Sequence, residues 1–317
     1  MRLLICTQAV DTQDPALGFF VRWIEELSKQ CEHVLVICLR KGTHSLPKNV
    51  EIISLGETHK IFRAFELCSI AWGRRNEYDA VFVHMNPEYI VAAGWLWRLW
   101  HKRIVLWYTH KSVDLRLRFA VVNANRVLTA SKESFRLPSR KLEIVGHGID
   151  TDFFSPYPNI VHSDFALSVG RLNQSKRHNL AIAGAAEANK YIKIIGEGPE
   201  RASLEELAKK LHAKAEFLGS LSQTQLLEEY RRASVLIHTS ETGSLDKVVL
   251  EALATDLPVI TTSDAYAGFP TQKVEGTPGA IAYALQHKQE NIDRAPIIRE
   301  KHSLSKLIPK IMKALQS

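Results

Sequence analysis

Short apolar runs alternate with segments of helical periodicity along the whole sequence, and this alternation limits the fold more than any other feature. In the first half, runs of strand length cover residues 3–6, 33–39, 80–83, 104–107, 126–129 and 143–145. A second series covers residues 165–169, 192–195, 216–218, 235–238 and 258–261. Strands that alternate with helices predict a parallel α/β fold, in which ligands bind just beyond the carboxyl ends of the strands.

Proline marks the place where two domains are expected to join. A chain of 317 residues is long enough for about two domains. Pro156 and Pro158 exclude a helix around them and predict a linker. We therefore expect one domain over residues 1–157, a second over 158–298, and a C-terminal segment over 299–317 that contains an amphipathic helix at 304–315.

Local patterns also predict where several helices begin. Apolar residues at helical spacing predict the first helix over residues 18–30, with Phe20, Trp23 and Leu27 on one face. Ser203 and Ser222 are each followed three residues later by Glu or Gln, which predicts two capping boxes.

The charge of the chain is positive and uneven. The net charge is +7, of which +5 lies on residues 1–157. This basic half is expected to attract an anion, such as an anionic membrane surface or a phosphorylated substrate. The excess is modest and no nucleic-acid module is present, so no nucleic-acid partner is predicted.

Several features predict a cytoplasmic protein. The longest apolar run, residues 90–97, is far below the roughly 20 residues that a membrane span needs. The first six residues predict a buried strand instead of a secretion signal. The four cysteines are not spaced for zinc, and buried thiols are typical of a reducing compartment.

Tryptophans and cations are interleaved late in the first half. Trp with Lys and Arg suits a membrane interface, and a core helix with a basic outer edge is the alternative. The residues are Trp95, Trp97, Arg98, Trp100, Lys102, Arg103 and Trp107.

Cations and glycines follow two strands of the second series. Arg171 and Lys176 stand five residues apart in the loop after strand 165–169. Arg offers a planar fork to phosphate oxygens and Lys a point charge, so the pair predicts a diphosphate site, with solvated surface charge as the alternative. Gly196 and Gly198 follow the next strand and would let a ligand approach the backbone, although a plain β–α turn is an equal explanation.

A small polar loop precedes the helix that is expected from residue 247. A helix N-terminus beneath loop 239–246 is suited to binding anions and hydroxyls. Asp246 is the expected N-cap of this helix, and we favour that structural role over a catalytic one. Glu251 lies one turn into an apolar helix, so its carboxylate needs a partner, either ribose hydroxyls or a neighbouring cation.

Candidate residues of the first half also follow strands. Gly18 opens the first helix, where its N–H is expected to face a phosphate or a sugar. His84, Asn86 and His110 follow strands and are candidates for contacts with sugar hydroxyls. The dinucleotide fingerprint G-x-G-x-x-G is absent, which argues against a nicotinamide or flavin enzyme, and no cofactor is predicted.

The ordered set of motifs resembles the retaining glycosyltransferases of family 4, which have the GT-B fold. In chain order these are the glycine at 18, YTHK (108–111), VLTASKES (127–134), the turn HGID (147–150), VGRL (169–172) with Lys176, IGEGP (195–199) and LEALATDLPVI (250–260). The resemblance implies an α/β fold of two Rossmann-like domains facing across a cleft, with the C-terminal helix crossing back to the first domain. It places the acceptor in the first domain and the nucleotide sugar in the second.

The resemblance also implies roles for the matching residues. Arg171 and Lys176 would bind the donor diphosphate and stabilise it as the leaving group, and His110 would contact the donor sugar; these are the expected catalytic residues. Glu251 would hold the ribose, and Gly18 would donate its N–H near the diphosphate. The other expected donor contacts are Gly196, Gly198, Glu241, Gly243, Ser244, Leu245 and Asp246, and the expected acceptor-side residues are His84 and Asn86.

Three positions depart from the family pattern. Gly243 stands eight positions before Glu251, where the family usually has a Glu that contacts the transferred sugar. Glu241 and Asp246 are the nearest substitutes, and without one we expect an altered donor preference or weak activity. His147 replaces an asparagine, and Arg177 replaces a glycine.

The expected function is transfer of a sugar from a UDP- or GDP-sugar to a hydroxyl acceptor, either a sugar or a lipid-linked sugar. Retention without a metal is expected, because no Asp-x-Asp motif stands at a strand end and the family relies on side chains and helix N-termini. A nucleotide-sugar-binding GT-B protein with weak catalysis and a nucleotide-sugar epimerase are the alternatives. The basic, Trp-rich first domain predicts a peripheral position on the inner face of a membrane.

Overall fold

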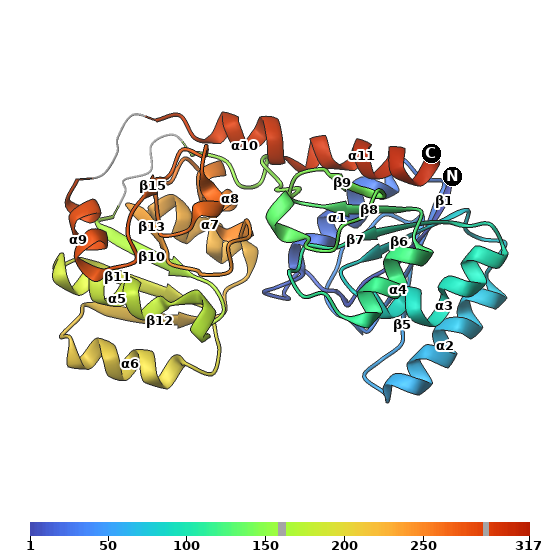
Figure 1. The fold of residues 1–317 in the computed structure, drawn as a ribbon, viewed down its shortest axis with the longest axis horizontal. Helices are drawn as coiled ribbons and strands as arrows, with labels where there is room; N and C mark the ends of the chain where they lie inside the picture. The colour runs from blue at the N-terminus through green and yellow to red at the C-terminus, as the bar shows by residue number, and fades with distance from the viewer. Residues whose placement is uncertain (158–162, 288–291) are drawn as a thin grey trace. The chain divides into compact units, whose positions relative to one another are not determined.

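Each half of the sequence builds a parallel sheet of its own (Figure 1). The structure is a computed structural model and describes residues 1–157, 163–287 and 292–317. Contacts divide the chain into unit 1, with residues 1–148 and 304–317, and unit 2, with residues 149–303. The chain therefore builds most of unit 1, then unit 2, and ends in a helix that belongs to unit 1.

Unit 1 contains a seven-stranded parallel sheet in the order β5-β3-β1-β6-β7-β8-β9. Its strands are β1 (Arg2–Cys6), β3 (His33–Cys38), β5 (Val50–Ser54), β6 (Ala80–His84), β7 (Arg103–Trp107), β8 (Arg126–Thr129) and β9 (Leu142–Ile144). A separate pair joins β2 (Ala9–Val10) to β4 (Arg40–Lys41). The strand order reverses between β1 and β6, and parallel sheets bind ligands at such a point.

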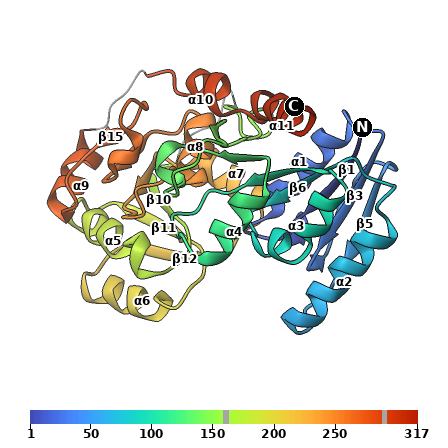
Figure 2. The same ribbon diagram turned by 45° about the vertical axis from the view of Figure 1, so that its right-hand side comes forward.

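Helices cover both faces of this sheet (Figure 2). The helices are α1 (Gly18–Ser28), α2 (Lys60–Gly73), α3 (Glu88–Leu99), α4 (Leu115–Asn123) and α11 (Leu304–Gln316), with a short 3-10 turn η1 (Lys132–Ser134). Leu3 and Ile5 of β1 share a core with α1 and α11, whereas Leu4 and Cys6 share another with α2, α3 and α4. Because successive strand residues point to opposite faces, a strand covered on both sides is apolar throughout.

Unit 2 contains a six-stranded parallel sheet in the order β12-β11-β10-β13-β14-β15. Its strands are β10 (Phe165–Val169), β11 (Tyr191–Ile195), β12 (Ala215–Gly219), β13 (Val235–His238), β14 (Val259–Thr261) and β15 (Gln272–Lys273). One core includes α5 (His178–Glu187), α6 (Arg201–Lys210) and α9 (Pro278–Gln286). The other includes α7 (Gln223–Arg232), α8 (Lys247–Ala254) and α10 (Ala295–His302). The 3-10 turns η2 (Gln174–Lys176) and η3 (Asp264–Tyr266) lie after β10 and β14.

The predicted α/β fold is confirmed, and each predicted strand agrees with an observed one to within one residue at either end. Strand β5 was not predicted, because it is only half-buried at the edge of its sheet and carries Glu51. The capping box at Ser222 is confirmed. The one at Ser203 is wrong: α6 begins at Arg201, and the Ser203 hydroxyl donates to the Glu200 carbonyl (2.8 Å).

The units divide at other positions than the sequence predicted. The first unit ends at residue 148 instead of 157, and residues 299–303 belong to unit 2. Pro158 lies outside the described residues. All four cysteines are free thiols, three of them buried and Cys68 half-buried. Within the described residues, no helix combines the length and the apolar character needed to cross a bilayer.

Candidate functional site

The loops after β10 and β11 pack on each other at the carboxyl edge of the unit 2 sheet. The Gly170 N–H donates to the Ile195 carbonyl (2.9 Å). Gly196 has a φ of +138°, and a Cβ there would overlap the Gly170 carbonyl, just as a Cβ at Gly198 would overlap that of Leu172. In this structure both glycines therefore serve the close approach of two loops, the turn explanation that the sequence left open.

The loop after β13 is fixed against the basic loop that follows β10. The Thr239 hydroxyl lies 2.9 Å from the carbonyls of Lys176 and Arg177. The Glu241 N–H donates to the Ser175 carbonyl (3.0 Å), and the Glu241 carboxylate pairs with Arg177 (3.1 Å). The two loops that sequence reasoning selected are thus neighbours in space.

Asp246 lies at the centre of a polar network between these loops. Its Oδ2 is 2.5 Å from Lys176 Nζ and 2.9 Å from His238 Nε2. Thr261 Oγ1 accepts from the Ser263 N–H (3.1 Å) and lies 3.0 Å from His238 Nδ1. Because an ionised carboxylate only accepts hydrogen bonds, both Lys176 Nζ and His238 Nε2 donate to Asp246.

The network explains the ionisation of Asp246. Burial alone would raise the pKa of this carboxyl, but the hydrogen bond from His238 and the charge of Lys176 lower the pKa well below its usual range. Asp246 occupies the predicted N-cap position of α8, but its side chain makes no capping hydrogen bond. Its N–H is engaged with the Tyr266 hydroxyl (2.6 Å).

Arg171, unlike Lys176, makes no ion pair with a carboxylate of the described residues. Its side chain is exposed, and no carboxylate in residues 1–157, 163–287 or 292–317 lies within ion-pair distance of it. The guanidinium is available to an anion that reaches this loop.

The short stretch before Asp246 has one left-handed residue and one core residue. Gly243 has a φ of +57°, which glycine adopts without strain. The Ser244 hydroxyl lies 3.4 Å from that of Thr242. Leu245 is buried in the core with α8, so its side chain serves packing.

Glu251 is buried on α8 beside Tyr230 and Lys247. It is 6% exposed, and Oε2 lies 3.5 Å from the Tyr230 hydroxyl. Burial raises the pKa of Glu251 and lowers that of Lys247, while the opposite charges of the two attract each other. Lys247 is the neighbouring cation that the alternative explanation required, and sequence reasoning did not select it.

Sequence reasoning also missed His178, the first residue of α5. Its ring is buried behind the basic loop, and Nδ1 lies 2.8 Å from Ser168 Oγ. Burial lowers its pKa to about 4, so it is neutral at pH 7. Its position directly after Lys176 and Arg177 was the only signal, and a single histidine beside two cations predicts no role.

Two predicted contacts in unit 1 are not available in this structure. The Gly18 N–H, expected to face a ligand, donates to the Asp14 carbonyl (2.8 Å). His84, expected on the acceptor side, is 1% exposed and its ring stacks on Phe20 at 3.9 Å. His84 is therefore part of the core between α1 and the sheet.

The other two unit 1 candidates lie nearer the surface. His110 is exposed, and its Nδ1 accepts from the Ser112 N–H (3.1 Å). Asn86 is half-buried and lines a pocket of unit 1. In residues 1–157, 163–287 and 292–317, no group of three or more His, Cys, Asp and Glu side chains is arranged to hold a metal.

Comparison with known proteins finds a family model that is similar to much of unit 2. Residues 150–289 match the family model described as glycosyl transferases group 1. Two curated relatives are sulfoquinovosyl transferase SQD2 of Arabidopsis thaliana (24% identity) and the gpi3 subunit of phosphatidylinositol N-acetylglucosaminyltransferase of Schizosaccharomyces pombe (26%). The alignments cover 55% and 46% of this chain but only 35% and 36% of the relatives.

A solved structure shows the same fold over the full chain. HepE of Anabaena, crystallised with UDP and glucose, superposes with a TM-score of 0.78 at 15% identity and 100% coverage of both chains. The fold is thus that of the GT-B glycosyltransferases.

Proposed function

We propose a substrate class and a mechanism for the chain, starting from the match of residues 150–289 to the family model described as glycosyl transferases group 1. The chain transfers a hexose-type sugar from a UDP- or GDP-sugar to a hydroxyl acceptor, either a sugar or a lipid-linked sugar. The anomeric configuration is retained, and no metal takes part.

The observation that carries this proposal is that Arg171 and Lys176 share the loop after β10, and that Lys176 reaches Asp246 at the start of α8. Breaking a sugar–phosphate bond builds negative charge on the leaving diphosphate. Preorganised donors that face such charge contribute typically about 3 kcal/mol each to lowering the barrier. Arg171 is free to bind phosphate oxygens, whereas Lys176 must leave Asp246 to do so. Glu251, His110 and the loop 243–246 would contact ribose and sugar hydroxyls.

Two observations favour a second candidate, a nucleotide-sugar-binding protein with weak catalysis. Asp246 neutralises Lys176, and Gly243 offers no carboxylate to the transferred sugar. Tight nucleotide binding without turnover or donor hydrolysis would favour this candidate over the transferase.

A thermal-shift screen against UDP, GDP, ADP, dTDP and their common sugars tests the donor site. A ligand at 100 times its dissociation constant stabilises a protein by about 2.7 kcal/mol. We expect a shift with one nucleotide family that disappears in Arg171→Ala and persists in Arg299→Ala, which removes an exposed arginine of α10. A shift that survives Arg171→Ala, or no shift at all, would overturn the proposed donor site.

We further propose that unit 1 binds an anionic membrane surface at the cytoplasmic face. The excess positive charge of residues 1–157 supports this. Two members of the Trp cluster, Trp97 and Trp107, belong to the core, but Trp95 is exposed on α3. Sedimentation of the chain with phosphatidylglycerol vesicles tests this membrane binding. Absence of binding at low salt would contradict the proposal.

A further inference from the structure

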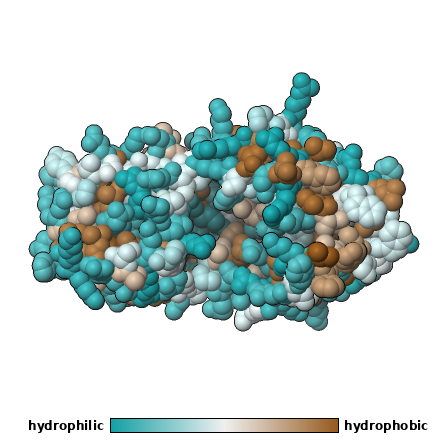
Figure 3. All heavy atoms as spheres, turned by 60° about the horizontal axis from the view of Figure 1, so that its bottom comes forward, coloured by the Kyte–Doolittle hydropathy of each residue, from teal (hydrophilic) through white to brown (hydrophobic). Residues whose placement is uncertain are grey.

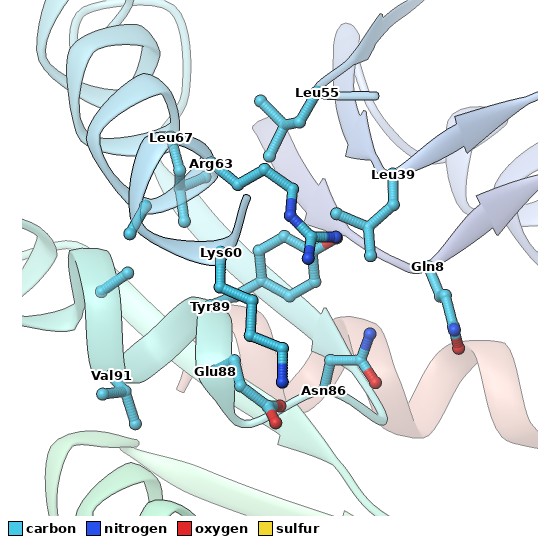
Figure 4. Close-up of a pocket in the computed structure, with 12 residues that line it drawn as sticks. Gln8, Leu39, Leu55, Lys60, Arg63, Leu67, Asn86, Glu88, Tyr89 and Val91 are labelled. Atoms are coloured by element: carbon cyan, nitrogen blue, oxygen red, sulfur yellow. The ribbon is translucent and has the colours of Figure 1, made fainter. Parts of the chain in front are cut away.

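A pocket of about 530 Å³ opens in unit 1 at the carboxyl ends of four neighbouring strands (Figure 4). Gln8 follows β1, Leu39 follows β3, Leu55 follows β5 and Asn86 follows β6. Helices α2 and α3 supply the other walls. The pocket therefore lies where parallel sheets bind ligands, and its volume suits a small molecule.

Two cations of α2 extend into this pocket without a carboxylate partner. In Figure 4, Arg63 extends from α2 over Tyr89, and Lys60 extends toward Asn86 and Glu88. Among the described residues, no carboxylate lies within 4.0 Å of either side chain, and Glu88, the acidic residue of the lining, pairs with Arg116 (2.7 Å). The pocket thus has an excess of positive charge, which favours an anionic ligand.

The remaining wall is apolar. Leu39, Leu55 and Leu67 line the pocket together with Ala64 and Ala92. A free inorganic anion would leave this surface unused, whereas a ligand that joins an anionic group to an apolar chain would cover both parts.

The outer surface of α2 indicates where such a ligand comes from. Of its 14 residues only Leu67 and Ala71 are buried. Ile61, Phe62 and Phe65 are 59%, 69% and 71% exposed and flank the two cations along the helix. Figure 3 shows apolar side chains on the face of unit 1 that carries α2. Exposed apolar side chains next to Lys and Arg are typical of helices that lie in a membrane interface.

We infer that this pocket binds the phosphate of a lipid-linked acceptor between Lys60 and Arg63, with the first apolar groups of the lipid against Leu39, Leu55 and Leu67. The inference rests on the proposed transferase function and names the acceptor class. Helix α2 meets the membrane with Ile61, Phe62 and Phe65, and the phosphate enters beside it.

The test is calorimetric titration of the full chain with dihexanoyl phosphatidic acid below its micelle concentration. Dihexanoyl phosphatidylcholine and glycerol 3-phosphate serve as comparison ligands. We expect phosphatidic acid to bind at least tenfold more tightly than either. Lys60→Gln and Arg63→Gln should each weaken it about tenfold, the usual effect of removing one charge-assisted hydrogen bond.

The double variant Arg75→Gln/Arg136→Gln is the matched control, since it removes two cations of unit 1 outside the lining. It should bind phosphatidic acid like the natural chain. The anion site would be overturned if the control lost as much affinity for phosphatidic acid as Lys60→Gln and Arg63→Gln, or if these two variants lost none. It would also be overturned if the natural chain bound the phosphatidylcholine as tightly as phosphatidic acid. If the natural chain bound glycerol 3-phosphate as tightly as phosphatidic acid, the ligand would not be a lipid.

The nucleotide thermal shift of the same variants separates the two proposals. An unchanged nucleotide shift in Lys60→Gln and Arg63→Gln shows that the variants are folded and that unit 2 is intact. If no nucleotide stabilises the natural chain or either variant, the proposed donor site is wrong. The titration with phosphatidic acid then still tests whether the unit 1 pocket binds a lipid phosphate.

Discussion

Asp246 holds a negative charge at the place where the proposed donor would put its own. Asp246→Asn should weaken the bonds to Lys176 and His238 and destabilise the chain at pH 7 by about 2 kcal/mol. Because the pKa of Asp246 is lowered in the folded state, its charge stabilises the fold above the ordinary value of 3.8 and loses this effect as the pH falls below it. The free energies of unfolding of the natural chain and of Asp246→Asn, measured in urea, should therefore differ less below about pH 4 than at pH 7.

The same substitution should act on ligand binding in the opposite direction. Freed from the carboxylate, Lys176 can turn to a phosphate, so the nucleotide identified by the screen should bind Asp246→Asn several-fold more tightly, as measured by calorimetry. Asp264→Asn, the control, removes an exposed carboxylate of unit 2 and should change neither the free energy of unfolding nor the affinity for the nucleotide. Weaker nucleotide binding in Asp246→Asn would mean that Asp246 itself contacts the donor.

Gly196 is constrained by the neighbouring loop. An added methyl group would overlap the Gly170 carbonyl, and a φ of +138° is unfavourable for any other residue. Gly196→Ala should lower the free energy of unfolding by about 2–4 kcal/mol. Gly279→Ala, in the first turn of α9 with its nearest contact at 3.6 Å, should be neutral or slightly stabilising. Equal stability of the two variants would contradict the packing explanation.

At the scale of elements, helix α11 completes the core of unit 1. Its buried side chains form one stripe along the helix, and Leu307 lies near Trp23 and Gly148. Leu307→Ala should leave a cavity and lower the free energy of unfolding by about 2–5 kcal/mol. Lys306→Ala, on the exposed side of the same turn, should stay within about 0.5 kcal/mol of the natural chain. Urea unfolding followed by tryptophan fluorescence measures both.

Elements were predictable where both faces of a strand are buried, because strands such as β3, β6 and β7 then contain unbroken runs of four or five apolar residues. Strand β5 gave no such signal, since an edge strand tolerates polar residues. The loop with Arg171 and Lys176 was predictable from its place after β10. The pairing of Lys176 with Asp246, 70 residues away in the chain, was not, because it depends on how β10 and β13 pair.

At the scale of the whole molecule, the two units differ in how they use the chain. Unit 2 is one continuous segment, residues 149–303, with two cores of its own. Unit 1 is made from both ends, and α11 supplies buried residues to its core. Because a domain folds alone when it has its own core, fragment 149–303 should unfold cooperatively in urea.

Fragment 1–148 should behave differently, since without α11 its core is exposed along one face of the sheet. We expect it to fold only when a peptide of residues 304–317 is added, with a gain in ellipticity that the peptide carrying Leu307→Ala does not give. Independent folding of fragment 1–148 would show that unit 1 does not need α11 to fold.

Fragment 149–303 also tests the proposed donor site. It should bind the same nucleotide as the full chain, and Arg171→Ala should abolish this binding. Loss of structure in fragment 149–303 would show that unit 2 depends on unit 1 for its stability.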